Sequence, residues 1–480
     1  MTRERAGLPL AAVAFAAVIL ASFPGLTPEA HRLAAVIAAV VILWVSEAIP
    51  LPATALLGVS AAVALGVAPA REAFAPFADP LMFLFIGAFI LARAIFVHGL
   101  NRRVAYAVLS LPWVGGSAGR ILFAFGAVTA AISGWISNTA TTAMMFGIGI
   151  SVLAAMGEDV RRSPYATALM LMTSFSASIG GLATPIGTPP NVIGLGFIRS
   201  TLGEEVSFFR WMLLGVPVVI VLYAVLYGWL RFVTRGTVGD LAATRALIGK
   251  ERATLGPWTP GQRSVAIAFG VTVLLWVLPG IVALAAGERS DAYRVLGERL
   301  PEGVAAIAGA LLLFLLPGDK GERAITWDEA VRIDWGVVLL YGGGFALGVL
   351  SFRTGLAEAA GRGLTGWLPL SGELGLLIAS VTVAIALSEA TSNTAAANMV
   401  VPVVISIAQA AGMDPFEPAL GATMAASLGF MLPVSTPCNA IVYGSGLIPL
   451  AKMIRYGAVL DVAGAVVIVV LVRALGAVVR

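Results

Sequence analysis

Apolar runs long enough to cross a lipid bilayer recur along almost the whole chain, and they restrict its fold more than any other feature. A spanning helix needs roughly twenty apolar residues, and its backbone polar groups must all be satisfied within the helix. Hydrophobic residues make up 59% and charged residues 12% of the 480 residues, whereas soluble domains use roughly half and a quarter. A water-soluble fold is therefore excluded, and the sequence predicts an all-α integral membrane protein.

Eleven of these runs are bounded by charge, glycine or proline and predict single transmembrane helices. They cover residues 8–24, 33–49, 52–68, 78–98, 166–198, 211–233, 264–286, 303–317, 336–352, 418–447 and 453–477. The first run has the charge and length of a secretion signal, but further spans follow it without a soluble domain, so we expect it to be retained. The distribution of Lys and Arg between alternate loops favours a cytoplasmic N-terminus in a multi-pass protein of the plasma (inner) membrane.

Two further apolar stretches, 118–156 and 372–411, are too long for one span, and each is interrupted at its centre by Ser-Asn-Thr. Irregular backbone is tolerated at membrane depth only where protein buries it or water reaches it. The pattern therefore predicts two re-entrant hairpins with polar tips.

The two halves of the chain match each other in order. The matching pairs are 85–89 with 341–345, 137–140 with 392–395, 184–191 with 432–439, and Glu47 with Glu302. Each copy would hold five spans and one hairpin, so the second copy would enter the membrane with the opposite orientation. We therefore predict inverted repeats, an arrangement that many transporters use to build a site at the middle of the membrane.

The repeats divide the chain into four predicted segments. These are an N-terminal transmembrane helix in 1–32, a first repeat in 33–235, a cytoplasmic linker in 236–263 and a second repeat in 264–480. The linker is the most basic part of the chain and is typical of a solvated connection with an interfacial helix. Because the other basic residues are scattered between apolar segments, we expect membrane lipid and no nucleic acid as a partner. One cysteine and two histidines exclude an internal disulfide framework and a His/Cys metal site.

Polar residues of the tips and of the paired Thr-Pro segments predict a binding site. Small residues, hydroxyls and prolines together would break the helices near 187–190 and 435–437, and each new helix would begin with N–H groups that favour an anion. Side chains that can donate to carboxylate or sulfate oxygens are those of Asn138, Thr139, Thr188, Asn393, Thr394 and Thr436. No Lys or Arg lies within these motifs, so helix dipoles and a co-bound cation would offset the charge of a dianion.

The cation would be one that prefers oxygen, because the motifs offer Ser and Asn oxygens and freed backbone carbonyls. Ser133 and Ser388 precede the two motif serines by four residues, which places them on the same helical face. Sodium fits this chemistry and zinc does not. Each repeat could thus form one sodium site.

An intramembrane hydrolase is a competing class, because Ser, Thr and Glu occur at membrane depth. The sequence contains no HExxH motif, and its two histidines offer a serine nucleophile no evident partner. A channel is a further alternative, but two broken segments in inverted repeats suit alternating access better. A carrier is the first hypothesis.

The paired Ser-Asn-Thr and Thr-Pro motifs resemble those of the divalent anion/sodium symporter family, over nearly the whole chain except the first span. The resemblance implies a homodimeric elevator-type secondary transporter of C4-dicarboxylates such as succinate, malate or fumarate, with no organic cofactor. It implies a first sodium site at Ser133, Ser137, Asn138 and the Gly187 backbone, and a second at Ser388, Thr391, Ser392, Asn393 and the Ser435 backbone. It implies substrate contacts at Asn138, Thr139, Thr188, Pro189, Asn393, Thr394, Thr436 and Pro437.

The chain departs from the family pattern at Cys438, where a second proline matching Pro190 is frequent, and in the Ala-Ala-Ala-Asn398 that follows the second tip. These departures affect the expected second sodium site and the size of the substrate. Some family members exchange dicarboxylates without sodium, and sulfate and tricarboxylates are further candidate substrates, so these alternatives stay open.

Overall fold

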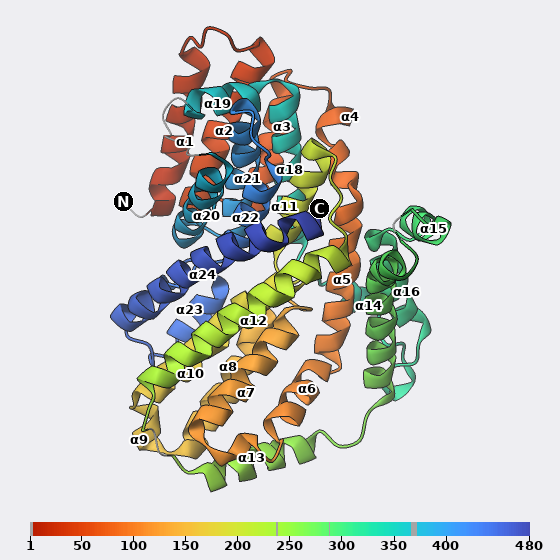
Figure 1. The fold of residues 1–480 in the computed structure, drawn as a ribbon, viewed down its shortest axis with the longest axis vertical. Coiled ribbons are helices and arrows are strands. Elements are labelled where there is room, and N and C mark those ends of the chain that lie inside the picture. The colour runs from red at the N-terminus through yellow and green to blue at the C-terminus, as the bar shows by residue number, and fades with distance from the viewer. Residues whose placement is uncertain (1–2, 237–238, 288, 366–371) are drawn as a thin grey trace.

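The computed structural model describes residues 3–236, 239–287, 289–365 and 372–480, and this part of the chain is built from helices (Figure 1). Ten of the described helices are long and apolar enough to span a membrane. The integral-membrane prediction is therefore supported. Residues 1–2, 237–238, 288 and 366–371 of the predicted segments 1–32, 236–263 and 264–480 lie outside the described residues.

Most predicted single spans correspond to one helix each. The helices are α1 (Arg3–Leu20), α2 (Pro28–Ser46), α3 (Leu51–Ala64), α5 (Pro80–Val97), α12 (Phe208–Val233), α14 (Pro260–Ala286), α16 (Glu302–Leu315), α18 (Trp335–Arg353) and α24 (Leu450–Val479). Local signals explain several of their starts. Thr27 Oγ1 accepts a hydrogen bond of 3.1 Å from Ala30 N and caps α2, and Asp79 Oδ1 accepts one of 2.8 Å from Leu81 N and caps α5.

Both stretches with a central Ser-Asn-Thr form two helices joined by a short non-helical tip. The first contains α7 (Ala118–Ser133) and α8 (Asn138–Met156), and the second contains α20 (Gly372–Ala390) and α21 (Asn393–Ala410). In both, the second helix begins at the asparagine of the motif. The helix breaks in both stretches therefore lie at the Ser-Asn-Thr motifs, and the re-entrant course of the two hairpins stays a prediction.

The stretches 166–198 and 418–447 are each divided by a break, as their Thr-Pro segments predict. The first contains α10 (Pro164–Gly180) and α11 (Pro189–Leu202), and the second contains α22 (Phe416–Ala425) and α23 (Pro437–Tyr443). Asn191 Nδ2 donates to the carbonyls of Gly181 and Thr184, both at 2.9 Å. Asn439 Nδ2 donates to Gly429 and Leu432, also at 2.9 Å. In each half one asparagine thus holds two carbonyls that the break has freed.

Several shorter helices are additional to the predicted spans, because their apolar residues do not form a long run. They are α6 (Leu100–Leu109), α13 (Leu241–Thr254), α15 (Asp291–Arg299) and α19 (Leu356–Thr365). The helix α13 lies in the predicted linker and contacts α6 and α8 at the lower end of Figure 1.

One matched pair of the sequence comparison does not occupy matching places. Glu47 is the C-cap that follows the last residue of α2, whereas Glu302 is the first residue of α16. The prolines Pro50 and Pro301, which precede α3 and α16, correspond better. The pairing of the two glutamates was therefore wrong. It displaces one half against the other along the chain by about the number of residues in one helical turn.

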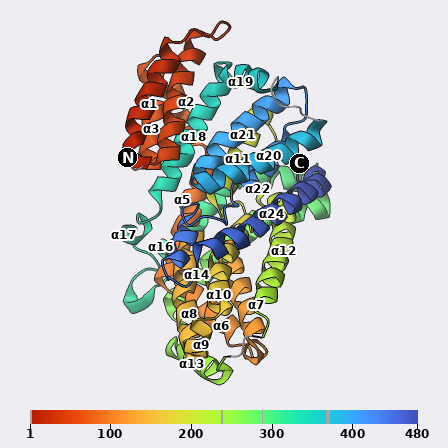
Figure 2. The same cartoon turned by 90° about the vertical axis from the view of Figure 1, so that its left-hand side faces the viewer.

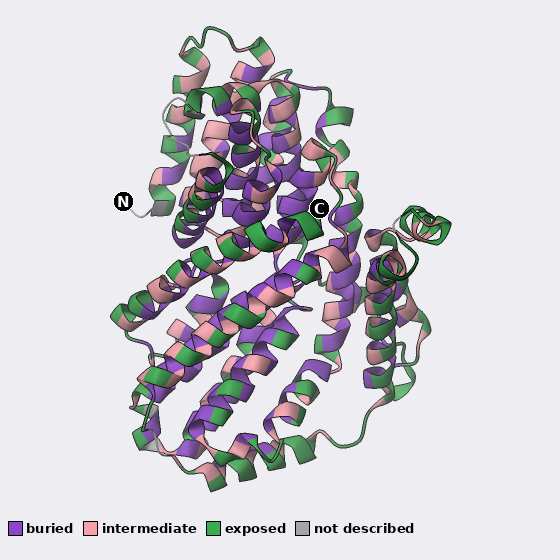
Figure 3. Cartoon of the chain, viewed as in Figure 1, coloured by how far each residue is buried: buried purple, intermediate pink, exposed green. Residues whose placement is uncertain are grey.

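The long helices α12 and α24 lie side by side and cross the molecule diagonally (Figure 1). The bundle of α1, α2 and α3 stands beside the upper end of the molecule when it is turned by 90° (Figure 2). Buried residues concentrate between these elements (Figure 3), and nearly all residues of α10 and its short extension are buried. A helix that is apolar all round belongs in such a core.

The contact between α5 and α16 depends on small residues. A Cβ at Gly87 would lie 2.5 Å from the Ala306 carbonyl carbon, and one at Gly303 would lie 2.5 Å from the Pro80 carbonyl oxygen. Such close backbone approach is typical of glycine at helix interfaces in membranes. The packing fixes the position of α5, which contributes one wall of the site described below.

We expect Gly87→Ala to destabilise the protein by about 1–3 kcal/mol, because its methyl group would overlap the α16 backbone. Gly270→Ala is the matched control, because a Cβ there meets no atom within 4 Å. Thermal denaturation in detergent measures both. A Gly87→Ala variant as stable as the control would contradict the close packing.

Candidate functional site

Both hairpin tips and both helix breaks meet at one cavity of about 570 Å³. This volume lies in the range of sites for small organic ligands. The cavity wall contains 136–140 and 392–394 from the tips, and 186–189 and 435–438 from the breaks. Every residue predicted to contact substrate is part of this wall: Asn138, Thr139, Thr188, Pro189, Asn393, Thr394, Thr436 and Pro437. The fold therefore brings together groups that are up to about 300 residues apart in the sequence.

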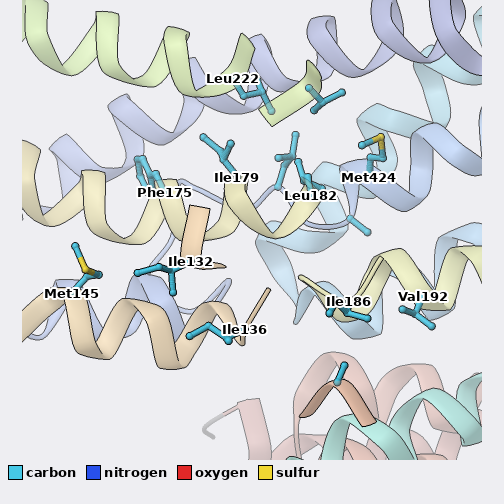
Figure 4. Close-up of a cluster of buried hydrophobic side chains, with 14 of the residues drawn as sticks. Ile132, Ile136, Met145, Phe175, Ile179, Leu182, Ile186, Val192, Leu222 and Met424 are labelled. Carbon is cyan, nitrogen blue, oxygen red and sulfur yellow. The ribbon is translucent and has the colours of Figure 1, made fainter. Parts of the chain in front are cut away.

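Apolar side chains support the first tip and the first break from behind. Ile132 and Ile136 lie near the end of the first hairpin, and Ile186 lies in the neighbouring break (Figure 4). Ile136 and Ile186 both contribute to the cavity wall and are at least nine-tenths buried. The polar groups of the site therefore stand on a packed base, which keeps them in place.

Helix N-termini point polar groups toward the cavity. Ser137 and Thr188 precede α8 and α11, and neither hydroxyl makes a capping hydrogen bond. Ser392 Oγ, in contrast, accepts from Ala395 N at 3.2 Å, and Thr436 Oγ1 accepts from Asn439 N at 3.1 Å. The first half thus has hydroxyl groups that can bond to a ligand, and helix N-termini favour an anionic one.

A cluster of oxygen atoms lies behind the first tip. Asn138 Oδ1 lies 2.7 Å from Ser133 Oγ, 3.1 Å from the Gly187 carbonyl oxygen and 3.2 Å from the Ala177 carbonyl oxygen. Turning the amide by 180° would let its nitrogen donate to all three oxygens. With the amide oxygen turned toward them, the same oxygens would form a ligand set for a small cation such as sodium. Ala177 was not predicted as a ligand.

Glycines allow these oxygens to approach one another. A Cβ at Gly181 would lie 2.7 Å from Asn138 Oδ1 and 3.0 Å from the Gly187 carbonyl oxygen. A Cβ at Gly187 would lie 2.5 Å from the Gly181 carbonyl oxygen. Side chains at these positions would fill the space between the ligands.

The second tip has a similar cluster around Ser388. Ser388 Oγ lies 2.8 Å from both Asn393 Oδ1 and the Ala426 carbonyl oxygen, and its single hydrogen can serve only one of them. The predicted ligand Thr391 is buried outside the cavity wall, and its hydroxyl donates to the Leu387 carbonyl at 2.8 Å. Ser133 and Ser388 are also buried behind the tips rather than in the cavity wall.

Glu389 fixes the second break. Its carboxylate accepts hydrogen bonds from Met431 N at 2.6 Å, Leu432 N at 3.1 Å and Ser435 Oγ at 2.7 Å. At the corresponding place of the first half, the Gly134 carbonyl accepts from Thr184 Oγ1 at 2.5 Å. Glu389 therefore holds the chain that carries Ser435 and Thr436 to the cavity, which is a positioning role for an acidic residue inside an apolar stretch.

Sequence reasoning missed the wall that α5 and the start of α18 contribute. This wall contains Phe89, Ala92, Arg93 and Phe96 from α5, and Arg332, Ile333, Asp334, Gly336, Val337 and Leu340 from the region of α18. Apart from Phe89, which ends the matched segment 85–89, these residues belong to no matched motif, and only tertiary packing brings them to the site. Arg93 did carry a signal, because it is a charged residue within an apolar span.

Comparison with known proteins identifies relatives of the whole chain. The family described as "Sodium:sulfate symporter transmembrane region" matches residues 4–479. The "Sodium-dependent dicarboxylate transporter SdcS" of Staphylococcus saprophyticus is 34% identical over 440 residues, which cover 89% of this chain and 83% of the relative. The protein of the same name from Staphylococcus aureus is 32% identical, with 89% of this chain and 82% of the relative covered.

Two solved structures share the fold at low sequence identity. The YdaH transporter of Alcanivorax borkumensis has a TM-score of 0.53 and 14% identity, with 98% of this chain and 96% of that chain covered. MtrF of Neisseria gonorrhoeae has a TM-score of 0.52 and 12% identity, with 83% and 81% covered. The similarity supports the all-helical fold.

We expect Gly181→Ala to abolish binding of a cation at the first tip, because its methyl group would occupy space between Asn138 and Gly187. The measurement is the gain in melting temperature when sodium replaces potassium. The gain should disappear in Gly181→Ala and persist in Gly147→Ala, since a Cβ at Gly147 meets no atom within 4 Å. Retention of the sodium-specific gain in Gly181→Ala would argue against a cation in this cluster.

Proposed function

The chain belongs to the sodium:sulfate symporter family, and from this premise we propose that it carries small dicarboxylates across the plasma membrane together with sodium ions. C4 compounds such as succinate, malate and fumarate are the proposed substrates. The observation that carries the proposal is the meeting of both tips and both breaks at one cavity of about 570 Å³. The names of the relatives, which are sodium-dependent dicarboxylate transporters, favour this substrate class over sulfate and tricarboxylates.

Hydroxyl, amide and backbone N–H groups would hold the substrate carboxylates. The four short polar segments at the cavity present donors from both halves of the chain, and helices begin at Asn138, Pro189, Asn393 and Pro437. A carboxylate that accepts several such bonds keeps its charge at low cost. The N-terminal ends of the helices add a favourable electrostatic contribution.

Sodium binding and substrate binding would be coupled through the tip asparagines. Asn138 contributes to the cavity wall and also directs Oδ1 into the oxygen cluster behind it. A cation among these oxygens would fix the amide with Oδ1 turned toward the cation, and would thereby order the tip that forms part of the cavity wall. The bound cation would thereby raise the affinity for the anion, and by linkage the anion would raise the affinity for the cation.

Transport would follow an elevator mechanism between inverted repeats. The moving part would comprise both hairpins and the segments 166–233 and 418–477, and the remaining spans would form the scaffold of a homodimer. An ion pair between Arg199 of α11 and Asp79 at the start of α5 joins the two parts, and Tyr341 Oη donates to Asp79 at 3.3 Å. These contacts would have to separate when the moving part slides.

Uptake of labelled succinate into proteoliposomes tests the proposal. Accumulation in empty vesicles that depends on an inward sodium gradient is the expected result. Uptake that needs no sodium but requires succinate inside the vesicle would instead identify a dicarboxylate exchanger. Transport of sulfate or citrate without succinate transport would reject the proposed substrate class, and the absence of uptake of all three anions would reject the carrier.

We expect Thr188→Val to raise the KM for succinate by about tenfold, since the variant keeps the shape of the side chain and loses a hydroxyl that would bond to a carboxylate. Thr382→Val is the control, because the Thr382 hydroxyl is exposed and donates to its own helix at 2.8 Å. Initial rates of uptake over a range of succinate concentrations measure both. Equal KM values in the two variants would remove Thr188 from the substrate site.

A further inference from the structure

We propose that the guanidinium group of Arg93 binds one carboxylate of the transported dianion while the hairpin tips bind the other. The inference rests on the proposed function and goes beyond the paired motifs, because Arg93 belongs to neither tip and neither break. It assigns the selection of dicarboxylates over monocarboxylates to a single side chain.

Arg93 reaches the cavity from a helix that is separate from all the motif segments. Four residues of α5 contribute to the wall at helical spacing: Phe89, Ala92, Arg93 and Phe96. Residues three and four apart share one helical face, so this face of α5 is turned to the cavity. Arg93 is its only charged member.

The guanidinium group has no partner in the part of the chain that the structure describes. Arg93 Nε is buried and makes no hydrogen bond, and no ion pair involves the side chain. A charged residue in a membrane span is costly, and it normally faces a partner or a water-filled cavity. An unpaired arginine at a cavity of ligand size therefore indicates a ligand that supplies the missing negative charge.

The other charged residues of the cavity wall do not neutralise Arg93. Asp334 is exposed, and its Oδ1 accepts a hydrogen bond of 3.2 Å from Val337 N as the cap of α18. Arg332 is a second cation, also exposed. The cavity thus offers an excess of positive charge to an anion. The motifs alone did not reveal this excess.

The chemistry of Arg93 suits a carboxylate. Its planar fork of N–H donors can bind both oxygens of one carboxylate at once. A dicarboxylate could place its first carboxylate among the hydroxyl and amide donors of the tips and its second against Arg93. A monocarboxylate would leave Arg93 without a partner, so the cavity would bind it more weakly than a dicarboxylate.

The test uses the purified protein in sodium buffer, and bound ligand is measured by its protection of the protein against thermal denaturation. Labelling of Cys438 is not used, because this cysteine of the cavity wall is buried. The two ligands are succinate and monomethyl succinate, which lacks one negative charge. The variants are Arg93→Gln, Arg93→Lys and Arg332→Gln.

In the unsubstituted chain we expect succinate to protect at a concentration about tenfold to a hundredfold lower than its monomethyl ester, since a charged hydrogen-bonded pair contributes this much. In Arg93→Gln the two concentrations should converge, and in Arg93→Lys they should become closer, because the charge remains but the fork is lost. Arg332→Gln should change the protecting concentrations of both ligands by a similar factor and preserve the ratio between them.

An undiminished ratio in Arg93→Gln would overturn the inference and leave the proposed function intact. If Arg93→Gln does not fold, an undiminished ratio in Arg93→Lys overturns it instead. If Arg332→Gln removes the difference between the two ligands as fully as Arg93→Gln does, the summed positive charge of the cavity selects the dianion. The specific contact between Arg93 and a carboxylate would then be rejected. Lack of protection of the unsubstituted chain by succinate would count against the proposed function itself.

Discussion

The structure depends on how backbone polar groups are satisfied where two buried helices are interrupted. A broken helix inside a membrane frees N–H and carbonyl groups that have no water to replace their partners. In each half one asparagine, Asn191 or Asn439, holds two freed carbonyls at the same spacing along the chain. Because these carbonyls are satisfied, the remaining groups of the breaks can be directed at a ligand without loss of the fold.

The same breaks place oxygen atoms close together behind the tips. Gly181 and Gly187 let two backbone segments approach Asn138, and the result is a cluster that contains more acceptors than donors. The second half reaches a related arrangement through other contacts. The Glu389 carboxylate holds the second break, whereas the Gly134 carbonyl holds the first break. The two halves therefore share a geometry while they differ in charge, and this difference would allow the two cation sites to differ in affinity.

The positions of the helices and of both polar tips could be predicted from the sequence because their signals are local. Apolar length fixes a span, Ser-Asn-Thr interrupts an apolar run, and the Thr-Pro segments break the helices that contain them. The short helices such as α6 and α19 could not be predicted in this way, since they have no long apolar run. The pairing of Glu47 with Glu302 failed for a related reason. Local sequence similarity does not fix the register of two segments when the turns that precede α3 and α16 differ in length.

For the site, the sequence by itself determined which motif residues carry polar chemistry, because two copies of an unusual pattern at membrane depth require a common cause. Only the tertiary structure decided what those motifs face. The wall formed by α5 and the start of α18, with Arg93 unpaired in it, results from packing between segments that share no motif with the tips. The net charge of a cavity depends on residues that the fold brings together from distant parts of the chain. No local sequence pattern therefore predicts it.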